Sequence, residues 1–171
     1  MIFILPIAGC DMSDMLVDLL KLPSKEKLDS LLSSLGKEGI NIRRAMAPDM
    51  MGILDFVQEA TGRNARGECT VCFSRQPVSC FIAEKDKKVI GYACYEATMR
   101  DFFGPTEVLK SFQGKKIGAA LLLSCLHSMK DMGYAYAIIG GVGPADFYTK
   151  VCGARLIENS TPGVYKDYLE L

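Results

Sequence analysis

The sequence predicts an α/β (α+β) fold in which helices flank a mixed, mostly antiparallel central sheet, with a helical N-terminal extension. Three observations support this fold class. A hairpin pattern in residues 79–97 precedes a third strand at residues 102–109, which favours an antiparallel meander. An amphipathic helix from Gln113 to Gly133 then leads into the apolar run YAYAIIGG, residues 134–141. Because a strand, a helix and a buried strand follow one another, we expect a right-handed parallel crossover.

The segments before the hairpin predict helices and one strand. Apolar residues recur at helical spacing in residues 12–20 and again in residues 28–35, which predicts two amphipathic helices. Residues 40–46 (INIRRAM) predict a strand, and residues 48–62 predict a helix that begins at a proline and ends at a glycine. Residues 63–77 fit either a strand or a short helix.

The segments after the hairpin complete the fold. The helix that follows Gln113 is expected to bury Gly118, Leu122, Cys125 and Met129. It is expected to turn Lys116, Ser124, His127 and Asp131 toward water. Residues 144–153 predict another helix, and residues 154–158 and 164–169 predict two closing strands joined by the turn STPG.

Composition and length bound the class of protein. A chain of 171 residues fits one domain, and we expect residues 1–39 to pack as an extension on a domain of residues 40–171. Basic and acidic residues number 20 each, so no basic field directs the chain to nucleic acid or an anionic membrane. The apolar start MIFILPIAG lacks a basic n-region, which favours a strand or packed arm over a signal peptide. Seven cysteines in apolar contexts favour reduced thiols and a cytoplasmic location.

The turn into the long helix carries the strongest chemical signal. In residues 113–119, a turn that contains Gly114 runs straight into the helix, where free backbone N–H groups and the positive end of the helix dipole meet. This arrangement predicts a phosphate site, to which Lys115 and Lys116 would add positive charge. A plain helix start with solvent-facing lysines is the alternative. The glycine spacing fits neither a Walker loop nor a dinucleotide fingerprint.

The same segment resembles the acyl-CoA loop of the GNAT N-acetyltransferase superfamily, Gln/Arg-x-x-Gly-x-Gly/Ala, with Gln113 first and Gly118 last. The order of elements agrees over residues 40–171. Residues 147–150 (Phe-Tyr-Thr-Lys) are similar to a second segment of that family. One departure is Lys116, which stands where the loop usually has its first glycine.

The resemblance implies a fold and a cosubstrate. The third strand of the meander and the strand in residues 134–141 would splay apart, and the pantetheine arm of acetyl-CoA would lie in the gap. The arm would pair with the free strand edge near Val108 and Leu109, where one backbone N–H would polarise the thioester carbonyl. The implied cofactor-binding residues are Val108, Leu109, Gln113, Gly114, Lys115, Lys116, Ile117, Gly118, Ala119 and Tyr148.

The implied chemistry is direct attack of a neutral amine on the thioester. Tyr148 is the candidate general acid that protonates the departing thiolate, and a core tyrosine is the alternative for this residue. Glu107 is the first candidate for the general base. Glu96 and Asp101 flank the same strand, and a water chain would serve in their place.

The resulting hypothesis is an acetyl-CoA-dependent N-acetyltransferase that acts on an unidentified primary amine. The alternatives are a non-catalytic acyl-CoA-binding or sensing module, and a protein whose N-terminal helices bind a partner. No metal is expected, because Cys69 and Cys72 have no second pair in the sequence pattern and His127 is the single histidine. The closing strands and the N-terminal helices could build a homodimer.

Overall fold

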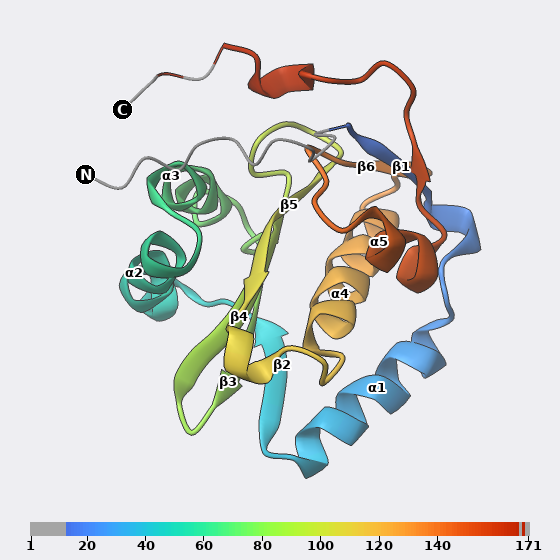
Figure 1. Ribbon diagram of the computed structural model, residues 1–171. Helices are drawn as coiled ribbons and strands as arrows, with labels where there is room; N and C mark the ends of the chain where they lie inside the picture. Colours follow the sequence, from blue (N-terminus) through green and yellow to red (C-terminus); the bar gives the residue numbers. More distant parts are fainter. Residues whose placement is uncertain (1–12, 168, 170–171) are drawn as a thin grey trace.

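The computed structural model describes residues 13–167 and 169 (Figure 1). These residues form a seven-stranded sheet in the order β2-β3-β4-β5-β6-β1-β7. The strands are β1 (Met15–Asp18), β2 (Ile40–Arg44), β3 (Cys80–Lys85), β4 (Lys88–Tyr95), β5 (Phe102–Val108), β6 (Tyr136–Ile139) and β7 (Arg155–Leu156). Among the described strands, β5 and β6 form the parallel pair and the other neighbours are antiparallel. The predicted mixed, mostly antiparallel sheet is therefore confirmed.

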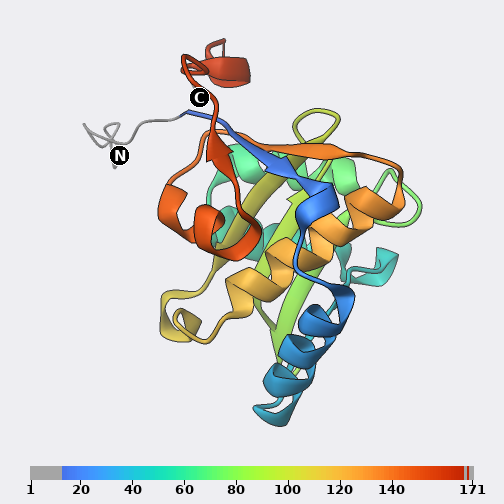
Figure 2. The ribbon, with the colours of Figure 1, turned by 90° about the vertical axis from the view of Figure 1, so that its right-hand side faces the viewer.

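Helices cover both faces of this sheet. They are α1 (Lys25–Lys37), α2 (Met50–Ala60), α3 (Arg63–Cys72), α4 (Ile117–Asp131) and α5 (Ala145–Cys152). Figure 1 shows α2 and α3 on one face, and Figure 2 shows α4 lying along the other face with α1 and α5 beside it. Two apolar cores result, one on each face. None of the helices in the described ranges has the length and apolar character needed to cross a membrane.

The parallel crossover is present and creates the gap that matters for function. The chain runs from β5 through α4 to β6, as predicted. The two strands pair only at Phe102 with Ile138 and at Phe103 with Ile139 within the described residues. Beyond these pairs β5 continues to Val108 while β6 ends, so the strands separate.

The first predicted helix is wrong. Residues 15–18 form β1, which lies between β6 and β7 of the sheet, and a 3₁₀ turn (Leu19–Lys21) follows. Met15, Val17 and Leu19 are fully buried in alternation, as in a strand. The segment MIFILPIAG lies outside the described residues. The boundary at residue 39 stays a prediction, although β1 belongs to the same sheet as the strands that follow it.

The remaining elements agree with the sequence except near the C-terminus. The helix and strand expected at residues 28–35 and 40–46 are α1 and β2, and the ambiguous residues 63–77 contain helix α3. The first closing strand is the short β7. The second expected strand is wrong where it is described, because Gly163–Tyr165 forms a 3₁₀ turn.

The polar face expected for α4 is also partly wrong. Ser124 and His127 are buried, because α1 packs against this side of α4. The His127 Nε2 atom lies 3.0 Å from the carbonyl oxygen of Pro23, just before α1. Lys116 and Asp131 are exposed, as expected.

Candidate functional site

The start of α4 leaves backbone donors without partners among the described residues. Gly114 and Lys116 both have positive φ angles, of 81° and 66°, and turn the chain sharply into the helix. No side chain caps this helix, and the Ala120 N–H is the first to bond back, at 3.1 Å from the Lys116 carbonyl oxygen. The N–H groups in the first turn of a helix have no acceptor within the helix. Those before Ala120 are therefore available to bind an anion.

A cavity of about 610 Å³ opens in front of these donors. It brings together most of the predicted site residues, namely Glu107, Val108, Gln113, Gly114, Lys116, Ile117, Gly118, Ala119 and Tyr148. Leu109 and Lys115 are not among its lining residues. The Lys115 ammonium group instead pairs with Glu38 at 3.0 Å, at the end of α1. The cavity can be called the α4 cavity.

The edge of β5 offers one of the two predicted backbone donors. The Leu109 N–H donates to the Ile90 carbonyl oxygen at 2.9 Å, so it is committed to β4. The Val108 N–H donates instead to the carboxylate of Glu107, at 3.0 Å. The Gln113 side chain donates to the Val108 carbonyl oxygen at 3.1 Å, which braces the turn against β5. Val108 is therefore the donor that a ligand can reach in this gap.

Gly118 lies on the wall of the α4 cavity, but the packing of the helix does not require a glycine there. A Cβ atom built on Gly118 would lie 3.5 Å from the ring of Phe147, which is an ordinary van der Waals contact. Close packing against neighbouring side chains is therefore not the reason for a glycine at this position.

A second cavity of about 510 Å³ lies on the other side of the gap between β5 and β6. Its walls come from α3, from the β5 residues Gly104–Thr106 and from the glycine-rich loop of residues 139–144. Glu68 is the charged residue among its described lining residues. Glu68 was not among the predicted site residues, because residues 63–77 were compatible with a strand. This cavity can be called the β6 cavity.

Tyr148 lines both cavities. Its ring packs edge-on against Phe103 and Phe147, with centroid distances of 6.3 and 5.1 Å. Burial raises the pKa of Tyr148 to about 12, and the nearby Cys152 and Glu107 act on this pKa in the same direction. The phenol therefore stays protonated over the physiological range and is available as a proton donor.

The other two candidate bases lie outside both cavities. Glu96 is buried, pairs with Arg75 at 3.0 Å and accepts hydrogen bonds from the Tyr134 hydroxyl and the Asp101 N–H. Burial, and then the charge of Glu96, raise the pKa of Asp101. These contacts hold the turn before β5 in place. Of the three candidate carboxylates, only Glu107 lines the α4 cavity.

Solved structures with a similar fold include acetyltransferases. A fungal GCN5-related glucosamine N-acetyltransferase region matches with a TM-score of 0.66 and 14% identity, over 85% of this chain and 19% of that one. A GCN5-related N-acetyltransferase from Sphaerobacter thermophilus matches with a TM-score of 0.64 and 16% identity, over 85% and 48% of the two chains. L-PGS from Bacillus licheniformis matches with a TM-score of 0.52 and 14% identity, over 85% and 58%. This chain thus spans less than two thirds of each of these proteins, and at such identities the likeness establishes the fold alone.

Sequence comparison assigns the family. Among curated proteins, none matches the chain. The sequence pattern of the Acetyltransferase (GNAT) family, however, matches residues 48–154, which include α2 to α5 and the start of α4 described above. Because this match extends over more than half of the residues, the chain belongs to the GNAT acetyltransferase family.

Proposed function

We propose that this chain transfers an acetyl group from acetyl-CoA to a primary amine by direct attack within a ternary complex. Membership of an acetyltransferase family supports group transfer in general. The observation that carries the finer proposal is the position of Tyr148, whose side chain lines both the α4 cavity and the β6 cavity. A proton donor between two cavities suits a reaction that joins a ligand from each.

In this proposal acetyl-CoA occupies the α4 cavity. The pyrophosphate would bind the uncapped N–H groups at the first turn of α4, with Gly114 permitting close approach and Lys116 adding charge. The pantetheine arm would run along the free edge of β5. The thioester carbonyl would then accept the hydrogen bond of the Val108 N–H, which Glu107 accepts in the present structure.

The proposed reaction has a balanced path for its protons. The amine loses a proton to a base and attacks the thioester carbonyl carbon, and the C–S bond breaks as the tetrahedral intermediate collapses. Tyr148 donates its phenolic proton to the departing sulfur and recovers a proton from solvent. Glu107 is the proposed base, and its carboxylate must first rotate away from Val108.

The β6 cavity is the proposed place of the acceptor. Apolar, aromatic and glycine residues form most of its wall. Among the described residues that line it, Glu68 is the one with a charged side chain. The Thr98 hydroxyl donates to that carboxylate at 2.6 Å and orients it. These features favour an amine with a compact apolar body and a second cationic or hydrogen-bonding group.

The test combines turnover with a binding variant. We expect the purified chain to release CoA from acetyl-CoA only when a reactive primary amine from a panel is present. Gly118→Glu should abolish acetyl-CoA binding in calorimetry through bulk and like charge at the phosphate site, whereas Gly118→Ala should bind normally because the methyl group fits. Binding without turnover of any amine would contradict catalysis and favour an acyl-CoA-binding module. Unchanged binding in Gly118→Glu would contradict the site itself.

A further inference from the structure

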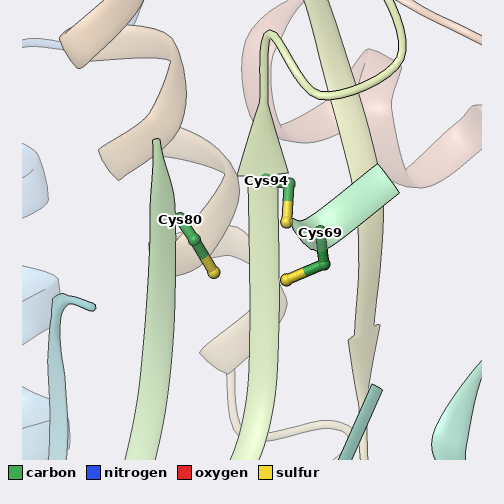
Figure 3. Close-up of side chains that lie close together, drawn as sticks. All are labelled: Cys69, Cys80 and Cys94. Atoms are coloured by element: carbon green, nitrogen blue, oxygen red, sulfur yellow. The ribbon is translucent and has the colours of Figure 1, made fainter. Parts of the chain in front are cut away.

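Four cysteines meet in the core between α3 and the sheet. Cys69 and Cys72 lie on α3, Cys80 lies on β3 and Cys94 on β4, and all four side chains are fully buried. Figure 3 shows the sulfurs of Cys69, Cys80 and Cys94 pointing toward one another between the helix and the hairpin. These three Sγ atoms all lie within 4.8 Å of one another. The four residues can be called the thiol cluster.

The fold supplies a second cysteine pair that is absent from the local sequence pattern. Cys80 and Cys94 are direct cross-strand partners in the β3–β4 hairpin. The Cys80 carbonyl oxygen accepts from the Ala45 N–H on the β2 side, and the Tyr95 N–H donates to the Ser79 carbonyl oxygen. Cys80 and Cys94 therefore form a non-hydrogen-bonded pair, in which the side chains of the two strands come closest.

Cys72 completes the group. It follows Cys69 by three positions on α3, so both side chains lie on the same helix face. The side chain of Cys72 contacts Cys69, Cys94 and Ser79. Its Sγ atom is not one of the three that all lie within 4.8 Å of one another, so it joins the cluster from the side of Cys69 and Cys94.

The thiol cluster could have two simpler roles, apolar packing or a disulfide. Neither role explains why all four cysteines come together. Buried cysteines often act as small apolar side chains, as Cys125 and Cys152 do singly in the other core. That role does not require four of the six described cysteines to converge from three elements. A cross-strand disulfide would use Cys80 and Cys94 but would leave the paired spacing of Cys69 and Cys72 on the facing helix without a purpose.

We propose that Cys69, Cys72, Cys80 and Cys94 form a buried tetrahedral thiolate site for a zinc ion. Zinc prefers four thiolate ligands at about 2.3 Å, which places the sulfurs about 3.8 Å apart, and two ligands spaced by two residues are common in such sites. The sulfurs of Cys69, Cys80 and Cys94 already lie within 4.8 Å of one another, and Cys72 would move toward them from the same face of α3 to complete that geometry. Binding releases the four thiol protons, leaves the oxidation state of every atom unchanged and gives a site with two net negative charges.

The site would hold one wall of the β6 cavity in place. It joins α3, which carries Glu68 and Ala65 of that wall, to the β3–β4 hairpin behind it. None of the four cysteines lines either cavity, so the zinc ion would not touch the reacting atoms. Zinc binding and acetyl transfer can therefore be tested independently of each other. A bound zinc ion would also contradict the expectation from the sequence that the chain holds no metal.

The test measures the metal directly on the full chain. Protein produced with zinc and without chelators should contain about one zinc ion per chain, by plasma mass spectrometry. Replacement with Co²⁺ should give the intense d–d and thiolate charge-transfer bands of a four-sulfur tetrahedral site. Cys69→Ser and Cys80→Ser should each lose these bands, whereas Cys125→Ser, an equally buried cysteine of the other core, should keep them.

Thermal stability gives a second measurement. It can be made on the wild-type chain, so it does not depend on whether the cysteine variants fold. A strong chelator at elevated temperature should lower the Tm of the wild-type chain and of Cys125→Ser, because zinc binding contributes to folding. The proposal is overturned if wild-type protein refolded with zinc or Co²⁺ binds neither ion at stoichiometric level. It is equally overturned if two of the four thiols prove to be oxidised to a disulfide when thiols are counted after denaturation.

Discussion

The Glu107 carboxylate accepts a hydrogen bond from the backbone N–H of Val108, at 3.0 Å, on the free edge of β5. The next N–H along the chain, that of Leu109, is already bonded to Ile90 of β4. The donor proposed for the thioester carbonyl is thus occupied by the side chain proposed as the base. Binding of acetyl-CoA in this gap would displace the carboxylate and release it to accept a proton, so the two proposed roles are linked through one rotation of Glu107.

Replacement of Glu107 separates these roles. Glu107→Ala should lower the KM for acetyl-CoA several-fold, because the thioester no longer competes with a carboxylate for the Val108 N–H. It should also lower kcat by about a hundredfold, because the base is lost. Glu107→Gln keeps an acceptor for Val108 and should lower kcat with little change in KM. An unchanged kcat in both variants would remove Glu107 from the mechanism and leave a water chain as the base.

Tyr148 should control the chemical step without controlling binding. Tyr148→Phe keeps the packing against Phe103 and Phe147 but removes the proton donor, so kcat should fall about tenfold or more while the Kd for CoA changes little. Burial raises the pKa of the phenol to about 12. The wild-type kcat should therefore not decline as the pH rises through about 10, where an ordinary tyrosine ionises. Equal kcat in the two proteins would make Tyr148 a core residue only.

Lys116 combines a strained backbone with a useful charge. Its φ angle of 66° is unfavourable for a residue with a Cβ atom. Lys116→Gly should raise the free energy of unfolding by about 1 kcal/mol in chemical denaturation. Lys116→Ala keeps the strain and should not stabilise. Both variants should raise the KM for acetyl-CoA about two- to fivefold if the ammonium group contacts a phosphate. An unchanged KM in both would show that the charge does not reach the cosubstrate.

The helices and strands that the sequence predicts well are those with a single clear period. The hairpin, α4 and the crossover to β6 belong to this class. Residues 12–20 do not, because the apolar positions fit helical spacing while Met15, Val17 and Leu19 also alternate as in a strand. Pairing with β6 and β7 decides between the two, and this pairing is not visible in a local pattern.

The two cavities of the candidate site also differ in how well the sequence predicts them. Most of the α4 cavity comes from residues 112–122 and the end of β5, and α5 adds Phe147, Tyr148 and Val151. The turn before the helix predicted the first group, whereas Tyr148 followed from the resemblance to a known family. The β6 cavity depends on α3, whose type the sequence left open. Once residues 63–72 are helical, Ala65 and Glu68 share a face and reach the same cavity. The thiol cluster needs both α3 and the hairpin register, so Cys69 and Cys72 appeared to lack a second pair.

His127 gives a prediction about stability below neutral pH. Burial lowers its pKa, and its Nδ1 atom is buried with no hydrogen-bond partner in the described ranges. Above the ordinary histidine pKa of about 6.5, neither the folded nor the unfolded chain holds the proton, and the full stability is present. As the pH falls below this value the unfolded chain takes up the proton first, so stability is lost until the lower folded pKa is passed. Each unit of lowering corresponds to about 1.4 kcal/mol.

The matched variant is His127→Gln, which retains a donor for the Pro23 carbonyl oxygen but does not titrate. The free energy of unfolding of the wild-type chain should fall more steeply than that of the variant as the pH falls below about 6.5. The two proteins have the same carboxylates, so the difference between the two curves isolates the histidine. Parallel curves would contradict this prediction. They would mean that α1 separates from α4 in acid and lets water reach His127 with little loss of free energy.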